Sequence, residues 1–321
     1  MAIELSYERF NNEDDIVPWY SREEVILNTG FANTLGGNDK ITGVGPGWRP
    51  SIYESGIINS GTLYTDQGND MITGTYDPTK YYVYNANYVM PNNGHSIYRD
   101  NTGNFYYPLP DLYGPIELPV NDYGIYNSGT IDTGMGDDTI TGSNITGGGY
   151  FSGYLTLDNT DSVAIYNGNT IKTGGGADSL ISDGQLINYG GVFLEDGNDT
   201  ITSYGVIYNS GRIETGNGND SIIADSFYGG FDGLGSVSLG NGNDYINGFG
   251  NGTFYGGDDE DTLELTPGSY IVGRSGSAVT FTKGSSVMIT SDFDKLRVNS
   301  IFMGSRTYDF SSLIHGQIIS V

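Results

Sequence analysis

Residues 125–142 read IYNSGTIDTGMGDDTITG, and the same frame returns at 165–182 as IYNGNTIKTGGGADSLIS and at 207–224 as IYNSGRIETGNGNDSIIA. In the first copy Asp138 follows Asn127 after eleven residues (138 − 127 = 11), and the other two copies keep this spacing. Internal repetition of this kind is typical of folds in which one structural unit is stacked on copies of itself. The repeat therefore decides the architecture.

The spacing between copies gives the period. Asn167, Asn188 and Asn209 follow one another at 21 residues (188 − 167 = 21 and 209 − 188 = 21). Each unit holds three short segments with inward apolar positions, separated by Asn-Ser-Gly and Gly-x-Gly-x-Asp turns, which indicates short β-strands. Such a unit buries its apolar positions only when neighbouring units cover them. We therefore expect an all-β fold, a parallel β-solenoid (β-helix or β-roll) of about 21-residue coils with a C-terminal β cap.

Stacked coils bring equivalent residues into columns, because neighbouring β-strands lie about 4.8 Å apart. One column is formed by the Asn of each copy. We expect its side-chain amides to hydrogen-bond the backbone at an inside turn, which is a structural role. Its members are Asn28, Asn59, Asn127, Asn167, Asn188 and Asn209.

A second column, formed by the Asp of each Gly-x-Gly-x-Asp loop, is the candidate site. Stacked carboxylates repel one another unless a cation neutralises them. Glycine permits positive φ, which turns carbonyl oxygens inward, and an oxygen-only ligand set suits Ca²⁺ in preference to Mg²⁺. The alternative is an ordinary set of Gly-Asn and Gly-Asp turns. The candidate ligands are the carboxylates of Asp39, Asp70, Asp138, Asp178, Asp199, Asp220, Asp244 and Asp261 and the loop backbone at Gly37, Gly68, Gly136, Gly176, Gly197, Gly218 and Gly242.

The composition agrees with a cation-binding chain. Only 13 Lys and Arg stand against 39 Asp and Glu, so nucleic acids and anionic membranes are poor partners. Eight loops leave at most seven gaps (8 − 1 = 7), and seven Ca²⁺ would change the net charge from −26 to −12 (−26 + 14). The chain has no Cys, which excludes disulfides and thiolate metal sites, and no apolar run long enough to span a membrane.

The run Gly-x-Gly-x-Asp-x-aliphatic resembles the RTX, or hemolysin-type, calcium-binding nonapeptide. The clearest match is 239–263, LGNGNDYINGFGNGTFYGGDDEDTL, where two Asp lie 17 residues apart (261 − 244 = 17). The resemblance covers about 25–263 and implies calcium binding in one row along one edge, since each coil has one such loop. It also implies type I secretion, guided by the C-terminal region. We expect no cleaved N-terminal signal peptide, because MAIELSYERFNNEDD lacks the basic and apolar regions of one.

Three domain-level regions are expected: 1–24 as an N-terminal cap or docking segment, 25–262 as the calcium-binding solenoid, and 263–321 as the C-terminal β cap and secretion region. Irregular spacings place insertions near 44–53, 75–121 and 143–161, and the last of these could instead be one off-pattern coil. The second is distinct, with nine Tyr between Tyr76 and Tyr113 and six of the ten Pro. Such loops commonly carry recognition, while a loop that packs on its own solenoid is an equally open interpretation.

No enzyme motif is evident. There is no Gly-x-Ser-x-Gly elbow and no His-Glu-x-x-His, and the two His, His95 and His315, are isolated. We expect a non-catalytic, extracellular or cell-surface protein, stabilised by calcium ions, with a structural or adhesive role. Its expected further partners are copies of itself, in a fibre or layer, or a surface polysaccharide. The alternative hypothesis is a carbohydrate- or partner-binding module that uses the 75–121 insertion.

Overall fold

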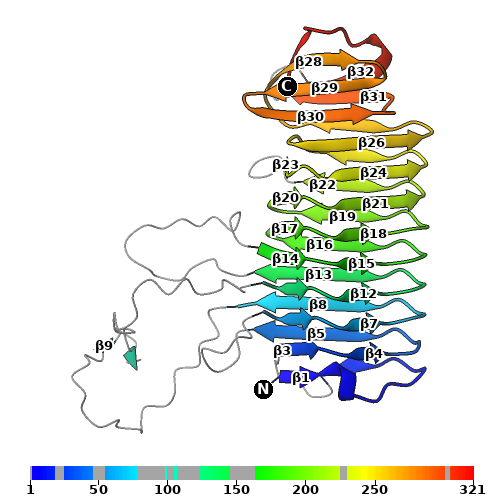
Figure 1. Ribbon diagram of the computed structural model, residues 1–321, viewed down its shortest axis with the longest axis vertical. Coiled ribbons are helices and arrows are strands. Elements are labelled where there is room, and N and C mark those ends of the chain that lie inside the picture. The colour runs from blue at the N-terminus through cyan, green and yellow to red at the C-terminus, as the bar shows by residue number, and fades with distance from the viewer. Residues whose placement is uncertain are drawn as a thin grey trace.

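The computed structural model describes residues 2–18, 25–45, 55–77, 98–99, 105–106, 123–144, 163–224, 230–300 and 304–321. The chain winds into a stack of β-coils, with the N-terminus at one end and the C-terminus at the other (Figure 1). The described residues contain no α-helix, and their helical turns η1 (Leu5–Tyr7) and η4 (Phe310–Ser312) are short. None of these described helical segments has the length and apolarity needed to cross a bilayer. The predicted parallel β-solenoid is confirmed.

Each coil contributes one strand to each of three sheets. The eight-stranded sheet has the order β1 (Ala2–Glu4), β3 (Val25–Asn28), β6 (Ile57–Asn59), β11 (Ile125–Asn127), β14 (Val163–Asn167), β17 (Gln185–Asn188), β20 (Val206–Asn209) and β23 (Gly230–Asp232). All its pairings are parallel, and equivalent residues of the repeat pair with one another, as Asn127 does with Asn167.

The chain then enters the twelve-stranded sheet. Its order is β4 (Phe31–Asn33), β7 (Thr62–Tyr64), β12 (Thr130–Asp132), β15 (Thr170–Lys172), β18 (Gly191–Phe193), β21 (Arg212–Asn217), β24 (Ser236–Asn241), β26 (Gly252–Asp258), β30 (Ser286–Ser291), β29 (Ala278–Lys283), β28 (Ser269–Ser275) and β33 (Ile318–Ser320). Its last members, β28 to β30 and β33, pair antiparallel with one another and form the end of the stack.

The eleven-stranded sheet closes each coil. Its order is β2 (Ile16–Val17), β5 (Lys40–Gly45), β8 (Met71–Tyr76), β13 (Thr139–Asn144), β16 (Ser179–Asp183), β19 (Thr200–Ser203), β22 (Ser221–Ala224), β25 (Tyr245–Asn247), β27 (Thr262–Leu265), β31 (Lys295–Ser300) and β32 (Gly304–Asp309). Parallel stacking continues through β27 and β31, beyond residue 262, before the antiparallel hairpin of β31 and β32.

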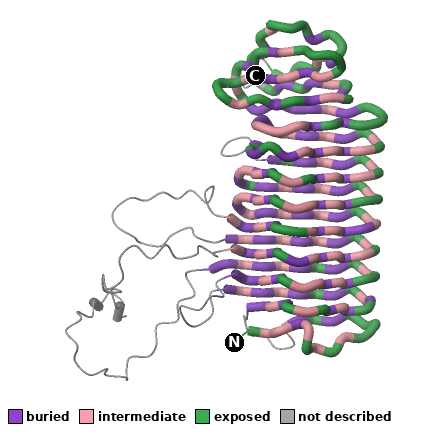
Figure 2. The backbone as a smooth tube through the Cα atoms, viewed as in Figure 1, coloured by how far each residue is buried: buried purple, intermediate pink, exposed green. Residues whose placement is uncertain are grey.

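The core is a continuous apolar column inside the three sheets. Ile125, Ile131 and Ile140, one from each sheet of the same coil, are all 0% exposed. Buried and partly exposed residues alternate along the strands because successive side chains point to opposite faces (Figure 2). At the N-terminal end, Leu5 of η1 is 1% exposed, and β1 and β2 continue two of the sheets. Chain segments therefore cover both ends of the core.

The three expected insertions begin later than their spacing suggests. Strand β5 reaches Gly45, β8 reaches Tyr76 and β13 reaches Asn144, each in register with its neighbours. Within 75–121 a further described element is the antiparallel pair β9 (Tyr98–Arg99) and β10 (Phe105–Tyr106). The recognition role expected for this insertion otherwise lies outside the described residues.

Candidate metal column

Each Gly-x-Gly-x-Asp loop forms the corner between the twelve-stranded and the eleven-stranded sheets. In the coil with Asp138, for example, the loop joins β12 to β13. Stacking places the eight predicted aspartates in one column, and each is between 0% and 2% exposed. The column therefore lies inside the wall of the solenoid, where a charged group loses most of its hydration.

One oxygen of each carboxylate is fixed by the neighbouring coil. The backbone N–H of Asp138 donates to Oδ1 of Asp178, and that of Asp178 donates to Oδ1 of Asp199, both over 2.8 Å. The same bond joins every consecutive pair from Asp39 to Asp261, with distances of 2.7 to 3.0 Å. These hydrogen bonds orient all eight side chains alike.

The other carboxylate oxygen has no partner. Within the described part of the chain, Oδ2 of each of the eight aspartates is buried and lacks a hydrogen bond. A buried polar atom without a partner is costly, and such atoms are rare in folded proteins. Eight equivalent orphans in one column therefore point to a group that is bound there or to protons on the carboxylates. The orphan atoms belong to Asp39, Asp70, Asp138, Asp178, Asp199, Asp220, Asp244 and Asp261.

The protonation equilibria of the column are shifted in the same direction. Burial raises the pKa of Asp138 to about 7, and the charges of Asp70 and Asp178 also raise it, against the Asp70 backbone N–H and the nearby Thr133 hydroxyl, which lower it. Burial likewise raises the pKa of Asp199 to about 7 and that of Asp244 to about 6. Without a counter-ion, the column therefore resists full ionisation near neutral pH.

The loop glycines let the backbones of adjacent coils approach closely beside the carboxylates. Gly218 has a φ of +139°, and a Cβ on it would lie 1.3 Å from the carbonyl oxygen of Gly197. A Cβ on Gly197 would lie 1.5 Å from the carbonyl oxygen of Gly176 and 2.7 Å from Oδ1 of Asp199. Neighbouring loops therefore pack backbone against backbone, with carbonyl oxygens close to the carboxylates, and only glycine fits at these positions. The same close approach of 1.3 to 1.8 Å recurs at Gly68, Gly136, Gly176, Gly197, Gly218 and Gly242, and on Gly37 a Cβ would meet the Glu13 carbonyl oxygen at 2.6 Å.

The N-terminal cap adds a further carboxylate, which differs from the others. The backbone N–H of Asp15 donates to Oδ1 of Asp39, so Asp15 continues the column. The backbone N–H of Asn11 donates to Oδ2 of Asp15 over 3.1 Å, and its Nδ2 donates to Oδ1 over 3.3 Å. Residues 11–15, NNEDD, contain no glycine. In the loop without glycine, Asn11 therefore hydrogen-bonds both oxygens of Asp15, whereas in the glycine loops Oδ2 of the aspartate has no hydrogen-bond partner among the described residues.

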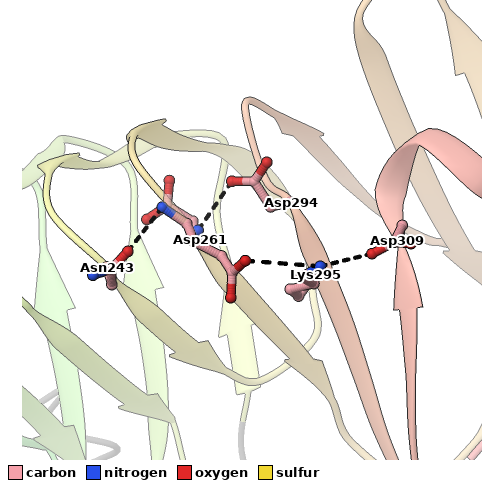
Figure 3. A network of polar contacts seen from close by, with 6 residues as sticks. Asn243, Asp261, Asp294, Lys295 and Asp309 are labelled. Atoms are coloured by element: carbon pink, nitrogen blue, oxygen red, sulfur yellow. Dashed lines mark hydrogen bonds and ion pairs between the residues drawn. The ribbon is translucent and has the colours of Figure 1, made fainter.

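At the opposite end the column runs into a charged network (Figure 3). The backbone N–H of Asp261 donates to Oδ2 of Asp294 over 3.1 Å, which makes Asp294 the terminal member. Lys295 Nζ lies 2.7 Å from Oδ1 of Asp309 and 3.8 Å from Oε2 of Glu260. The hydrogen bond to Asp309 and the charges of Asp309, Glu260 and Asp294 raise the pKa of Lys295. A fixed ammonium group thus supplies positive charge at this end.

Sequence analysis missed Asp15 and Asp294. Each lies in a weaker form of the repeat, since Asp15 is followed two residues later by Val17 and Asp294 by Leu296, both buried. The Asp-x-aliphatic part of the pattern was therefore present, but the preceding glycines were not. A search for that shorter pattern next to the terminal coils would have found both residues.

Two amide ladders hold the loops in register. In the predicted Asn column, Nδ2 of Asn167 donates to Oδ1 of Asn188 over 2.8 Å, and the same bond joins all consecutive members. Outside the Asp column, the N–H of Asn219 donates to Oδ1 of Asn198 over 2.7 Å, and that of Asn243 to Oδ1 of Asn219 over 2.8 Å. The ladders fix the spacing of the column without contributing charge.

No group of three or more His, Cys, Asp or Glu side chains is gathered as a metal site among the described residues. The column offers carboxylates one per coil, so a cation there requires backbone carbonyl oxygens as additional ligands. Carbonyl oxygens of the loop glycines lie near the carboxylates, since the Gly176 carbonyl oxygen and Asp199 Oδ1 both lie within 2.7 Å of the Cβ position of Gly197. Calcium accepts mixed carboxylate and carbonyl ligands in flexible geometry. The residues present therefore fit Ca²⁺ better than a metal that needs clustered side chains.

Fold and column together define a three-sided parallel β-solenoid with a buried column of aspartates. No protein-family model matches the chain, and no curated protein matches it. Among solved structures, the chain is similar to a hyperactive, Ca²⁺-dependent, β-helical antifreeze protein from an Antarctic bacterium. The match has 16% sequence identity and a TM-score of 0.24, and it covers 82% of this chain and 77% of that one. Both values are low, so we infer the function from this chain's own residues and not from the similarity.

Proposed function

We propose that this protein is a calcium-stabilised β-solenoid whose folding is coupled to calcium in the surrounding medium. The observation that carries the proposal is the column of eight buried, unpartnered Oδ2 atoms. These carboxylates would hold the ions together with carbonyl oxygens of the loop glycines. Bound Ca²⁺ supplies the positive charge that a stack of ionised carboxylates lacks.

Folding is coupled to calcium because the aspartates have different surroundings in the folded and the unfolded chain. The folded state brings eight carboxylates into one buried line, whereas the unfolded chain leaves them hydrated and apart. Ions that bind only the folded state stabilise it by mass action, by about 2.7 kcal/mol for each site at a free concentration one hundred times Kd. Extracellular calcium modules bind with Kd of roughly 10⁻⁴ to 10⁻³ M, so a cytosol poor in calcium leaves such a chain unfolded.

The broader role is a non-catalytic one outside the cell, as a structural or adhesive element at the cell surface. The RTX-like repeats and the C-terminal region favour export by type I secretion, a route in which the chain leaves the cell unfolded. A rigid, capped rod of stacked coils supports a structural role, since it presents repeated side chains at fixed spacing. Self-assembly into a fibre or layer belongs to the same proposal.

Thermal unfolding with and without calcium tests the central claim. We expect circular dichroism to report a large β-sheet signal and one high melting transition at millimolar Ca²⁺, and loss or strong lowering of that transition after chelation. Native mass spectrometry of the same samples should count several bound ions. Mg²⁺ at equal concentration is the matched control and should restore much less stability.

Two outcomes contradict the proposal. One is a chain that is equally stable in metal-free buffer and in calcium at pH 8. The other is a calcium-loaded spectrum in which no bound ion is found, because the column would then be neutralised by protons alone.

A further inference from the structure

The outer face of the eight-stranded sheet carries an apolar stripe. In six consecutive strands, the outward residue at one register position is aliphatic or aromatic, and each pairs with the next along the stack. We call these residues the tyrosine stripe. They are Leu27, Ile58, Tyr126, Tyr166, Ile187 and Tyr208.

The aromatic rings on this face form a continuous row. The rings of Tyr126 and Tyr166 stack with centroids 5.0 Å apart and planes 10° apart. Tyr123 stacks on both, at 5.7 and 5.4 Å. Tyr189, which is 53% exposed, lies 5.8 Å from Tyr166 and 5.6 Å from Tyr208. One aromatic side chain after another thus follows the axis with the period of the coils.

This face is uncharged over the length of the stripe. The stripe begins next to Glu4, the register partner of Leu27, and ends next to Asp232, the partner of Tyr208. Between them, the exposed residue that directly follows each strand has a hydroxyl group or is glycine, and none is charged, although the first, Thr29, donates to the Glu4 carboxylate. These flanking residues are Thr29, Ser60, Ser128, Gly168, Tyr189 and Ser210. In a chain of net charge −26, this face thus combines a lack of charge with a row of aromatic rings.

The twelve-stranded sheet provides the contrast. Its outward residues in the central coils include Asp132, Lys172 and Glu214, and Lys172 pairs with Glu195 over 2.8 Å. The same register column also holds Tyr64 and Phe193, so that face mixes charged and aromatic side chains. The composition of the tyrosine stripe is not a general property of this solenoid.

We infer that the tyrosine stripe binds a linear, uncharged polysaccharide laid along the axis of the solenoid. The acidic surface elsewhere repels anionic polymers, while the stripe itself offers no charge to a cationic one. Tyrosine rings bind the apolar faces of sugar rings, and the flanking hydroxyls and phenol groups supply hydrogen bonds to sugar hydroxyls. A glycan in extended form also repeats its ring at a distance similar to the coil spacing. The inference deepens the adhesive role proposed above by naming its ligand class and surface.

The test uses the full chain, loaded with calcium, and measures binding to β-1,4-glucan by pull-down and calorimetry. Hyaluronate, which calcium does not gel, is the anionic comparison. The variant Tyr126→Leu/Tyr166→Leu removes two rings but keeps apolar side chains like those of Leu27 and Ile58. We expect binding to the neutral glucan, little to hyaluronate, and affinity about tenfold weaker in the double variant. Tyr126→Phe/Tyr166→Phe should retain most of the affinity.

A matched control is Tyr255→Leu, since Tyr255 is 41% exposed on the outer face of the twelve-stranded sheet. It should bind as the unaltered chain does. Equal binding by the Tyr126→Leu/Tyr166→Leu variant overturns the inference, and so does absence of binding to the glucan. If the glucan binds only after deletion of 78–122, the occupant of the stripe is that segment of the same chain. If the double variant loses self-association, the occupant is a second copy of the protein. Each of these two outcomes also overturns the inference.

Calcium-dependent melting is measured on the same samples. If melting depends on calcium while the glucan does not bind, only the stripe assignment fails. If melting is independent of calcium, the proposed coupling fails whatever the glucan result.

Discussion

The backbone N–H of Asp178 donates to Oδ1 of Asp199 over 2.8 Å, while Oδ2 of Asp199 is buried without a partner in the described structure. One carboxylate thus performs two tasks. Its first oxygen links adjacent coils, and under the proposed function its second contributes negative charge to a bound cation. Because the link needs a hydrogen-bond acceptor and the cation needs a charge, the two tasks can be separated by substitution.

The substitution Asp199→Asn separates the hydrogen-bonding task of this carboxylate from its proposed cation-binding task. The amide retains Oδ1 as an acceptor for Asp178 but replaces the charged Oδ2 with a neutral NH₂ group. In metal-free buffer at pH 8 we expect the variant to be more stable than the unaltered chain by about 1–3 kcal/mol, because a buried charge is removed. With saturating calcium we expect the order to reverse, because a ligand is lost. Urea unfolding under both conditions measures the crossing.

The control for this substitution is Asp196→Asn, on the same loop. Asp196 is exposed, and its Oδ1 accepts a hydrogen bond from Asn217 Nδ2 over 2.5 Å, which the amide retains. Its effect should stay within about 0.5 kcal/mol in either buffer. If Asp199→Asn destabilises the chain equally with and without calcium, its carboxylate has only the structural task.

Acidification should stabilise the metal-free protein. The folded-state pKa values are raised, to about 7 for Asp138 and Asp199 and about 6 for Asp70, above the ordinary value of 3.8. Between these values the folded chain binds more protons than the unfolded chain, so the free energy of unfolding rises as pH falls from about 8 towards 4. Below the ordinary pKa of 3.8 the aspartates are protonated in both the folded and the unfolded state, so the free energy of unfolding stops rising.

In saturating calcium the trend should be opposite over the same interval, because protons compete with the cation for the carboxylates. Melting temperatures at pH 8, 7, 6 and 5, with and without Ca²⁺, give both curves. Parallel curves would show that the aspartates do not bind the metal.

Substitution of a loop glycine should also destabilise the fold. Gly218→Ala would place a Cβ 1.3 Å from the Gly197 carbonyl oxygen at a φ of +139°, so backbone must move. We expect a loss of about 3 kcal/mol or more in the free energy of unfolding, measured in urea with calcium. Gly276→Ala is the control, because Gly276 has a φ of +63° but no atom within 4 Å of its Cβ position. It should cost about 1–2 kcal/mol. Equal losses would mean that close approach of the coils does not matter.

The period of the repeat accounts for most of what could be predicted. Equal spacing of Asn167, Asn188 and Asn209 fixes the parallel register, and register alone places every Asp above the next. Asp15 escaped prediction because its loop lacks glycine, and Asn11 takes over the role of satisfying its carboxylate. Only the Asp-x-aliphatic part of the repeat, Asp15 followed by Val17, marks this residue in the sequence.

The tyrosine stripe was missed for a different reason. Tyr126 and Tyr166 stand at an outward position of the same IYN segment that supplied the core and the Asn column. A short strand with apolar residues on both faces does not say which side is covered, because periodicity gives alternation but not partners. Only the stacked rings, 5.0 Å apart, showed that this face differs from the other two.

The last prediction concerns the buried Asn column. Nδ2 of Asn188 donates to Oδ1 of Asn209 over 2.9 Å and to the carbonyl oxygen of Arg212 over 3.1 Å, while its own Oδ1 accepts from Asn167. Asn188→Ala leaves buried donors and acceptors unpaired on both sides and should lower the free energy of unfolding by about 2–4 kcal/mol, equally with and without calcium. Asn198→Ala, which breaks a similar bond at the exposed outer ladder, should cost less than about 1 kcal/mol. Urea unfolding of both variants measures the difference, and a calcium-dependent effect of Asn188→Ala would contradict a purely structural role for this column.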